Sequence, residues 1–343
     1  MTPAVTWLLP VKNGMPFLRE TLASIKSQVY RDWQVLAWDN GSTDETVEEL
    51  RRWIPARLPG RIVIDRPLGL GASLAEMVDL CKTEFCARID ADDVNLPLRL
   101  QEQIAFLRNH PDVAVVGSQV IRIDEAGREH GQFHQLPSRH DDIVHRMLYA
   151  WVMWHPTVVF RRQAVMTVGN YRDFSPLIED YDLWMRLAVR NQLANLDGCL
   201  VNYRVREEGA TEQAIKQGVL TPALLNCFAT NAPALFGCSE QEAIRLRSRN
   251  SRFLLPLLLR IARHLCRHGE RTLRGRLRTE SLGMAVARLV SDRDPMTKLF
   301  FACWNPWFRH ARRRKPSDTG LWRSPAQRWC PKASERNETE ERR

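Results

Sequence analysis

The chain has 343 residues, 44% of them hydrophobic, so it is long enough to bury a full globular core and is no small disulfide-stapled scaffold. Its eight cysteines show no repeated C-x-x-C spacing, which argues against a zinc ribbon or a disulfide framework and favours reduced thiols. The net charge of +10 divides unevenly: residues 245–343 carry 25 Lys+Arg against 9 Asp+Glu (+16), and residues 1–244 carry 25 against 31 (−6). An acidic amino-terminal half disfavours nucleic acid as its substrate.

The amino terminus has no positively charged segment ahead of an apolar stretch, so we expect no secretory signal peptide. The longest apolar run, Phe253–Leu259, contains Pro256 and falls short of the ~20 residues that a spanning helix needs. No transmembrane segment is predicted. We therefore expect a cytoplasmic protein, with peripheral attachment to the inner face of the cytoplasmic membrane left open.

Apolar runs alternate with stretches of helical periodicity over the first 120 residues or so. The expected strands are Val5–Val11, Gln34–Trp38, Arg61–Asp65, Phe85–Ile89 and Val113–Val116. The expected helices lie within Phe17–Tyr30, Ala72–Lys82 and Leu98–Asn109. This alternation predicts an α/β fold with a mostly parallel sheet flanked by helices.

The second half of the chain is less regular. A strand is expected at His155–Arg161, a helix at Glu179–Arg190 and a closing strand at Gly198–Arg204. We place a domain boundary near Gly209, where the sequence becomes helical and arginine-rich. The resulting division is a catalytic domain over 1–209, a helical basic region over 210–314 and a tail over 315–343 whose Pro, Ser and charge content is typical of disorder.

Three polar clusters stand where expected strands end. They span residues 10–14, 39–44 and 90–93. Ligands of open α/β sheets bind beyond the carboxyl ends of the strands, so these clusters are expected to converge in space.

The sharpest chemical signal is Asp90-Ala91-Asp92-Asp93. Three carboxylates at the end of a buried strand repel one another unless a cation or hydrogen-bond donors compensate them. Mg²⁺ suits such a place, because it takes one or two protein carboxylates and completes its shell with phosphate oxygens and water. The simpler alternative is a solvated acidic turn.

Two further acidic positions have a functional and a structural interpretation. Asp39 ends a strand and can accept a hydrogen bond from a nucleobase imide or a ribose hydroxyl, or it can form an Asx-turn. Glu179 and Asp180 open a helical run, where first-turn carboxylates also stabilise the helix through its dipole.

Five motifs follow one another along the chain. They are Leu9-Pro10-Val11-Lys12-Asn13-Gly14, Asp39-Asn40-Gly41-Ser42-Thr43-Asp44, Asp90-Ala91-Asp92-Asp93 with Pro97 and Arg99-Leu100, His155-Pro156-Thr157-Val158-Val159-Phe160-Arg161-Arg162, and Glu179-Asp180-Tyr181-Asp182-Leu183-Trp184-Met185-Arg186-Leu187. Each motif is weakly specific alone, but five in this order and spacing are strong evidence. Over about residues 4 to 206 the chain closely resembles family 2 inverting glycosyltransferases.

The resemblance implies a Rossmann-like GT-A fold, a nucleotide-diphosphate sugar donor, a divalent cation (Mn²⁺ or Mg²⁺) on the D-x-D motif, and transfer of one sugar with inversion. It implies an acceptor that is a glycan or glycolipid of cell-surface polysaccharide or lipopolysaccharide synthesis. Its residue assignments place Asp180 as catalytic base with Glu179 beside it, Asp92 on the metal, Asp90 at the ribose or sugar, Asp39 at the base, and Pro10, Lys12 and Asn13 around the nucleotide.

The chain departs from the family pattern in two places. Many relatives read Y-R-x-H after the closing strand, with the histidine near the metal or diphosphate, whereas this chain reads Tyr203-Arg204-Val205-Arg206. Arg206 cannot ligate a metal but can bind phosphate with two hydrogen bonds, which favours the diphosphate site over the metal site. The Q-x-x-R-W signature of processive synthases is absent, which favours transfer of a single sugar.

The carboxyl-terminal part has an amphipathic pattern with a basic stripe. Apolar residues recur from Leu254 to Leu265 while arginines follow at steps of three or four, and Leu299–Phe308 precedes the basic run Arg312–Lys315. Aromatic residues beside polybasic segments suit the surface of an anionic membrane. A helical cap on the catalytic domain with a solvated arginine face explains the pattern equally well.

Two other classes of protein compete with the glycosyltransferase. A nucleotidyltransferase also combines an α/β sheet with paired Asp residues and Mg²⁺, but its phosphate loop is richer in Gly and basic residues than Pro10–Gly14. A catalytically dead nucleotide-sugar-binding protein or an RNA-binding protein is disfavoured because Asp92 and Asp180 are present and stacking aromatics are not evident.

Overall fold

The computed structural model describes residues 3–64, 66–130, 135–148, 150–173, 177–206 and 209–247, with 257, 260, 261, 264 and 265. The aromatic segment Leu299–Phe308, the tail 315–343 and most of the amphipathic stretch from Leu254 lie outside these residues.

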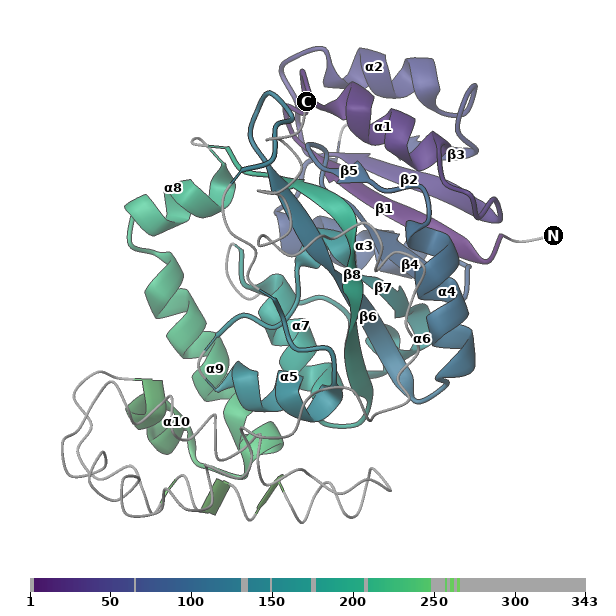
Figure 1. Ribbon diagram of the computed structural model, residues 1–343. Coiled ribbons are helices and arrows are strands. Elements are labelled where there is room, and N and C mark those ends of the chain that lie inside the picture. Colours follow the sequence, from purple (N-terminus) through teal and green to yellow (C-terminus); the bar gives the residue numbers. More distant parts are fainter. Residues whose placement is uncertain are drawn as a thin grey trace, which may run out of the picture.

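One eight-stranded sheet runs through the described part in the order β3-β2-β1-β4-β7-β6-β8-β5 (Figure 1). The strands β1, β2, β3 and β4 pair in parallel, as do β6 and β8, while β7 and β5 pair antiparallel to their neighbours. The predicted α/β fold is confirmed, with β7 inserted between the two parallel parts. The strand bounds are β1 Val5–Val11, β2 Trp33–Asp39, β3 Gly60–Val63, β4 Phe85–Arg88, β5 Val94–Asn95, β6 Val113–Ile123, β7 Val159–Arg161 and β8 Gln192–Arg204.

Helices cover both faces of this sheet. Because successive strand residues point to opposite faces, Trp7 and Leu9 of β1 pack with α1, α2 and α4, whereas Leu8 between them packs with α3, α7 and α9. The helix bounds are α1 Leu18–Lys26, α2 Thr46–Trp53, α3 Leu70–Leu80, α4 Arg99–Asn109, α5 His140–Met147, α6 Arg162–Thr167, α7 Glu179–Ala188, α8 Ala210–Lys216, α9 Leu220–Phe236 and α10 Glu240–Arg247, with a short 3₁₀ turn, η1, at His155–Thr157.

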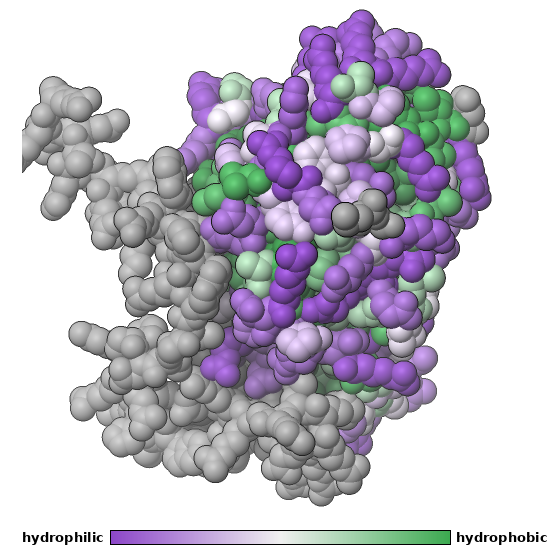
Figure 2. All heavy atoms as spheres, turned by 90° about the vertical axis from the view of Figure 1, so that its right-hand side faces the viewer, coloured by the Kyte–Doolittle hydropathy of each residue, from purple (hydrophilic) through white to green (hydrophobic). Residues whose placement is uncertain are grey.

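The outer surface on the side of α4 is largely hydrophilic, with smaller apolar areas between the polar side chains (Figure 2). Such a mixture is ordinary for the solvent-facing side of packed helices. No helix in the described ranges is long and apolar enough to cross a lipid bilayer.

The expected strand at His155–Arg161 is wrong in its first half. Residues His155–Thr157 form η1, and only Val159–Arg161 pairs as β7. Thr157 donates from Oγ1 to the carbonyl of Trp154 at 2.8 Å, which closes the turn. Pro156 has no backbone N–H to donate to a neighbouring strand, which also favours the turn.

Two strands are much longer than expected. The strand β6 has 11 residues and β8 has 13, because their buried polar residues interrupt the apolar pattern without ending the strand. Gln119 donates from Nε2 to the carbonyl of Leu136 at 3.0 Å, and Asn195 donates from Nδ2 to the carbonyl of Val152 at 2.9 Å. A buried amide that meets backbone partners in this way is tolerated inside a sheet.

Helix α9 packs against α7 and shares its core. Phe228 and Phe236 of α9 are fully buried in the cluster that also holds Tyr181 and Trp184 of α7. Arg247 at the end of α10 donates to the carbonyl of Met147 at 2.7 Å and to the hydroxyl of Tyr181 in α7 at 2.5 Å. The helices after Gly209 are therefore tied to the helix that carries Glu179 and Asp180.

Candidate active site

The first two polar clusters meet at the carboxyl ends of β1 and β2. The backbone N–H of Asn13 donates to Ser42 Oγ at 2.9 Å, and the N–H of Thr43 donates to Asn13 Oδ1 at 2.8 Å. Pro10 is buried beside its register partner Trp38, while the Lys12 side chain is exposed to solvent. A φ of 51° at Asn13 turns the chain here, in the left-handed region that asparagine tolerates better than most residues.

The third cluster joins them through helix α1. Thr21 Oγ1 donates to the carbonyl oxygens of Ala91 at 2.9 Å and Asp93 at 2.8 Å. A Cβ on Gly14 would lie 3.5 Å from that of Ala91, so the turn after β1 lies against the acidic turn after β4. The expected convergence of the three clusters is confirmed.

Asp39 does form an Asx-turn. Its Oδ2 accepts hydrogen bonds from the N–H groups of Gly41 and Ser42, both at 3.1 Å, and the residue is 3% exposed. The same residue lines an open cavity of about 520 Å³ that is bordered by the 41–44 turn, helix α2 and Pro67. Asp39 can therefore hold the turn and still present part of its carboxylate to a ligand in this cavity.

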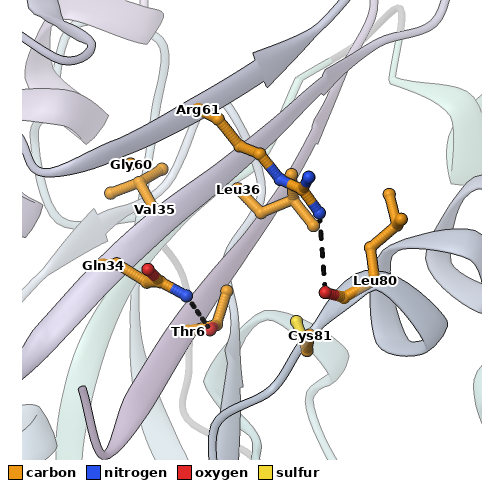
Figure 3. A pocket seen from close by; sticks show the side chains of 8 residues that line it. All are labelled: Thr6, Gln34, Val35, Leu36, Gly60, Arg61, Leu80 and Cys81. Atoms are coloured by element: carbon orange, nitrogen blue, oxygen red, sulfur yellow. Dashed lines mark hydrogen bonds between the residues drawn. The ribbon is translucent and has the colours of Figure 1, made fainter. Parts of the chain in front are cut away.

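A second cavity, of about 260 Å³, lies at the other end of the same strands (Figure 3). It is bordered by Thr6, Gln34 and Gly60 near the starts of β1, β2 and β3, and by Arg61 and Cys81. Figure 3 shows Gln34 donating to Thr6 Oγ1, at 3.1 Å, across this space. Since the polar clusters are at the carboxyl ends of the strands, this cavity is not part of the candidate site.

The three carboxylates after β4 have different surroundings. Asp90 pairs with Arg88 (Oδ2 to NH1, 2.5 Å), Asp92 with Arg206 (Oδ2 to NH1, 3.3 Å), and Asp93 accepts the backbone N–H of Arg204 at 2.8 Å. Burial, and then the neighbouring carboxylates, raise the pKa of Asp92 and raise that of Asp93 well above the ordinary range. Asp93 therefore anchors β8, whereas Asp90 and Asp92 are partly exposed, with side chains 35% and 27% accessible.

Arg88 is a buried cation between the acidic turn and helix α7. It is 1% exposed, and its Nε meets no hydrogen-bond acceptor among the described residues. Burial opposes its charge, but the adjacent Asp90, with smaller contributions from Tyr171 and Glu179, raises the pKa of Arg88 overall. Burial raises the pKa of Glu179 and of Asp180 overall, and the charge of Arg88 partly opposes that rise, so Arg88 lies within electrostatic reach of both.

Glu179 and Asp180 are both buried at the start of α7. Burial, followed by the charge of Glu179, raises the pKa of Asp180 to about 8, and burial likewise raises the pKa of Glu179. Asp180 Oδ1 accepts the N–H of Tyr181 at 2.6 Å, and within the described part of the chain Glu179 Oε2 has no hydrogen-bond partner. A carboxyl group that titrates near neutral pH is well matched to accepting a proton in catalysis.

His155 and Tyr171 complete the buried cluster around Glu179. His155 Nδ1 lies 3.7 Å from Glu179 Oε1, and its Nε2 is 3.0 Å from the hydroxyl of Tyr171. Burial, and then Arg88, hold the pKa of His155 well below its usual range, so its ring is neutral. The contact with Glu179 is therefore one of a neutral imidazole with a carboxyl group.

Asp182, the next acid of α7, has a structural role. It is fully buried, and its Oδ2 accepts from Arg186 NH2 at 2.6 Å while Oδ1 accepts from Asn231 Nδ2 at 2.9 Å. Its charge is therefore neutralised inside the protein and is not directed at a ligand.

The acidic turn fits a divalent cation that takes most of its ligands from elsewhere. The described residues contain no group of three or more His, Cys, Asp or Glu side chains placed to enclose a metal. The side chain of Asp92 is 27% exposed, and a hard cation can bind one or two carboxylates and complete its shell with phosphate and water. The donor set of this turn therefore suits a cation that arrives with a diphosphate.

The sequence reasoning missed Arg88, His155 and Tyr171 as members of the site. Arg88 carried a usable signal, because residues i and i+2 of a strand point to the same face and Arg88 precedes Asp90 by two. His155 lay in one of the quoted motifs without a role. Tyr171 reaches the site through a tertiary contact and carried no local signal.

Comparison with known proteins identifies the family. A sequence model described as Glycosyl transferase family 2 matches residues 6–169. The amylovoran biosynthesis glycosyltransferase AmsE of Erwinia amylovora is 33% identical over 190 residues, covering 54% of this chain and 70% of AmsE.

Two solved structures share the fold at low sequence identity. The S. aureus TarS 1–349 complex with UDP-GlcNAc has a TM-score of 0.57 at 16% identity, over 85% of this chain and 82% of TarS 1–349. The mannosyltransferase PcManGT of Pyrobaculum calidifontis, in complex with GDP-Man and Mn²⁺, has a TM-score of 0.52 at 17% identity, over 96% of this chain and 83% of PcManGT. The sequence relationship and the sheet described above lead to one conclusion: the chain is a glycosyltransferase with a GT-A fold and belongs to glycosyl transferase family 2.

Proposed function

We propose that the protein transfers one sugar from a nucleotide-diphosphate sugar to an acceptor hydroxyl with inversion, and that Asp180 is the base. The observation that carries the proposal is the placement of Asp180, which is buried at the start of α7 next to Glu179, where burial and the charge of Glu179 raise its pKa to about 8. A single displacement needs one base and no covalent intermediate, whereas retaining glycosidases need a second carboxylate as nucleophile.

The donor end of the proposed site lies along the carboxyl ends of β1, β2 and β4. Asp39 would bind the base or ribose beside the cavity of about 520 Å³, with Pro10, Lys12 and Asn13 lining the nucleotide and Asp90 facing ribose or sugar. Solved structures of the same fold with UDP-GlcNAc and GDP-Man support a donor of this class.

Asp92 is the proposed ligand of Mn²⁺ or Mg²⁺, and Arg206 would bind the diphosphate. A divalent cation at this turn would supply charge stabilisation of the leaving diphosphate. The Mn²⁺ of the PcManGT complex supports a divalent cation here. Arg88 holds Asp90 in place at 2.5 Å, so the acidic turn keeps one carboxylate compensated before any ligand binds.

The acceptor end of the proposed site is at the start of α7. Asp180 would take the proton of the acceptor hydroxyl, with Glu179 next to it in the chain and 3.7 Å from the neutral His155. The relationship to a glycosyltransferase of amylovoran biosynthesis supports a role in polysaccharide biosynthesis, with a glycan or glycolipid as acceptor. Neither a nucleotidyltransferase nor a non-catalytic sugar-nucleotide-binding or RNA-binding protein is favoured by the comparisons.

A donor screen tests this function. The full chain is incubated with UDP-, GDP- and dTDP-sugars, with and without Mn²⁺, and the released nucleoside diphosphate is measured. Slow hydrolysis of one class of donor would identify the nucleotide before the acceptor is known. Release from none of them, with or without metal, would contradict the proposal.

Asp39→Ala is expected to weaken binding of the matching nucleoside diphosphate without changing the chemical step. Loss of a hydrogen bond that a carboxylate accepts from a ligand costs about 1.5–3 kcal/mol, so affinity should fall on the order of 10- to 100-fold. Isothermal titration measures the affinity, and transfer at saturating donor measures the chemical step. Because Asp39 also holds Gly41 and Ser42, Asp39→Asn is the control that retains an acceptor oxygen for the turn. Unchanged affinity in Asp39→Ala would refute the binding role.

We also propose that the basic carboxyl-terminal region attaches the enzyme to anionic membranes. Ile261 and Leu265 are buried in the core, so a deletion that spares the fold must begin after them. Removing residues 270–343, which carry 18 Lys+Arg against 9 Asp+Glu, is expected to abolish co-sedimentation with phosphatidylglycerol vesicles. Donor hydrolysis should persist, and vesicles of phosphatidylcholine alone are the control. Equal sedimentation of the full and shortened chains would contradict the attachment.

A further inference from the structure

Arg206 lies at the point where the last strand reaches the acidic turn. The strand β8 pairs with β5, with Asn202 opposite Val94, and this pairing brings residues 203–206 beside residues 92 and 93. Arg206 NH1 donates to Asp92 Oδ2 at 3.3 Å, and among the described residues this is the one acceptor that its side chain meets. The guanidinium carbon lies 5.3 Å from the ring centroid of Phe17.

The side chain of the neighbouring Arg204 is buried and bonds to groups within the fold. It donates to the carbonyls of Asp92 at 2.9 Å, Asp124 at 3.0 Å and Glu125 at 3.1 Å, and it pairs with Glu20 at 2.5 Å. Its side chain is 1% exposed. Two arginines thus lie over Phe17, at 4.5 Å and 5.3 Å. Within the described structure the buried Arg204 uses four of its five N–H donors, whereas Arg206 uses one and its side chain is 31% exposed.

The pair between Arg206 and Asp92 is weak enough to exchange. The two side chains are 31% and 27% exposed, and one long hydrogen bond joins them. A partly exposed pair joined by one long hydrogen bond is weaker than the bidentate contact that a guanidinium makes with phosphate. A diphosphate arriving at the turn is therefore a better partner for Arg206 than Asp92 is.

We propose that Arg206 is a built-in counter-cation that neutralises Asp92 in the free enzyme and moves to the donor diphosphate, freeing Asp92 for the metal only when donor is present. The inference rests on the proposed donor class and adds to it an order of binding. With Arg206 on Asp92, a divalent cation meets a paired carboxylate and a nearby positive charge, so it binds poorly alone. The nucleotide removes both obstacles at once and brings phosphate ligands.

The first claim is that Arg206 hinders metal binding at Asp92 in the free enzyme. It is tested by titrating the full-length protein with Mn²⁺ in the absence of nucleotide, followed by electron paramagnetic resonance. Arg206→Ala is expected to bind Mn²⁺ about five-fold or more tightly than the parent, because it loses both the ion pair and the repulsion of the cation. Arg206→His should bind at least as tightly, since imidazole can also act as a ligand. Arg260→Ala removes the exposed partner of Glu242 in the helical region and is the matched control, with no change expected.

The second claim is that Arg206 binds the diphosphate of the donor. It is tested by titrating the metal-free protein with UDP, GDP and dTDP. The tightest-binding of the three should lose about ten-fold in affinity in Arg206→Ala, and less in Arg206→Lys, which keeps the charge but not the planar fork. Unchanged Mn²⁺ affinity in both Arg206→Ala and Arg206→His, or unchanged nucleotide affinity in Arg206→Ala, would overturn the inference alone. If the parent binds none of the three nucleotides, the proposed donor class falls as well.

Discussion

Asp92→Asn is expected to abolish metal-dependent sugar transfer while leaving the protein folded. The amide oxygen of asparagine carries no net charge and is a poorer ligand for a hard cation than a carboxylate, so the loss should be ~10²-fold or more. Burial and the charge of Asp90 already raise the pKa of Asp92, which means that its ionised form is costly in the folded state. Neutralising it should therefore leave the melting temperature unchanged or slightly higher.

Three measurements on one preparation separate the role of Asp92 as a ligand from a role in folding. Mn²⁺ affinity in the presence of nucleoside diphosphate and transfer rate should both fall, while the thermal transition should not. Asp197→Asn, which neutralises an exposed carboxylate further back on β8, is the matched control and should change none of the three. Equal activity of Asp92→Asn and the parent in saturating Mn²⁺ would remove Asp92 from the metal site.

The sheet could be predicted from the sequence because its signals are local. The bounds of β1 match the expected Val5–Val11, and β4 ends within one residue of the expected position, just before the acidic turn. In both places an apolar run of strand length stops abruptly at turn residues, so pattern and structure agree. The end of β6 and the start of β8 were missed because both strands contain buried amides, where polarity in the sequence does not mean exposure, and the start of β7 was missed because His155–Thr157 forms η1.

The different roles of the acidic residues could not be predicted in the same way. Asp92 and Asp93 are neighbours of identical chemistry, and only the pairing of β5 with β8 makes one of them a buried acceptor for Arg204 N–H and leaves the other at the surface. Likewise, Asp180 and Asp182 share a helix turn. The partner that neutralises Asp182, Arg186, is visible at i+4, but the burial that raises the pKa of Asp180 arises from tertiary packing.

Asp180→Asn is expected to show the largest loss of transfer with the smallest loss of binding. The substitution keeps the shape of the side chain and removes the proton acceptor, so transfer should fall by ~10²–10⁴, or about 3–5 kcal/mol in the activation barrier. Affinity for the nucleoside diphosphate should be retained. Glu179→Gln should cost less, because Glu179 lies next to Asp180 and contacts His155 at 3.7 Å without being the proposed base.

The pH dependence gives Asp180 an independent signature. Its pKa of about 8 means that the base form accumulates as pH rises through that value, so the transfer rate of the parent should rise with pH and level off above about 8. A carboxylate of ordinary pKa would give a flat profile over the same range. The residual activity of Asp180→Asn should lack this rise.

Stability against pH then separates a catalytic base from an acid that merely stabilises the start of a helix. Between the ordinary value of 3.8 and about 8, folded Asp180 holds a proton that the unfolded chain has lost, so this group makes the fold less stable as pH rises through that window. Asp180→Asn removes this loss of stability, so the melting temperature of the variant should rise relative to that of the parent as pH increases. A first-turn carboxylate that only favours the helix dipole predicts the reverse, a loss of about 0.3–1 kcal/mol on neutralisation with near-normal turnover. Transfer rate and melting temperature measured together from pH 5 to pH 9 would decide between them, and the second pattern would take Asp180 out of the mechanism.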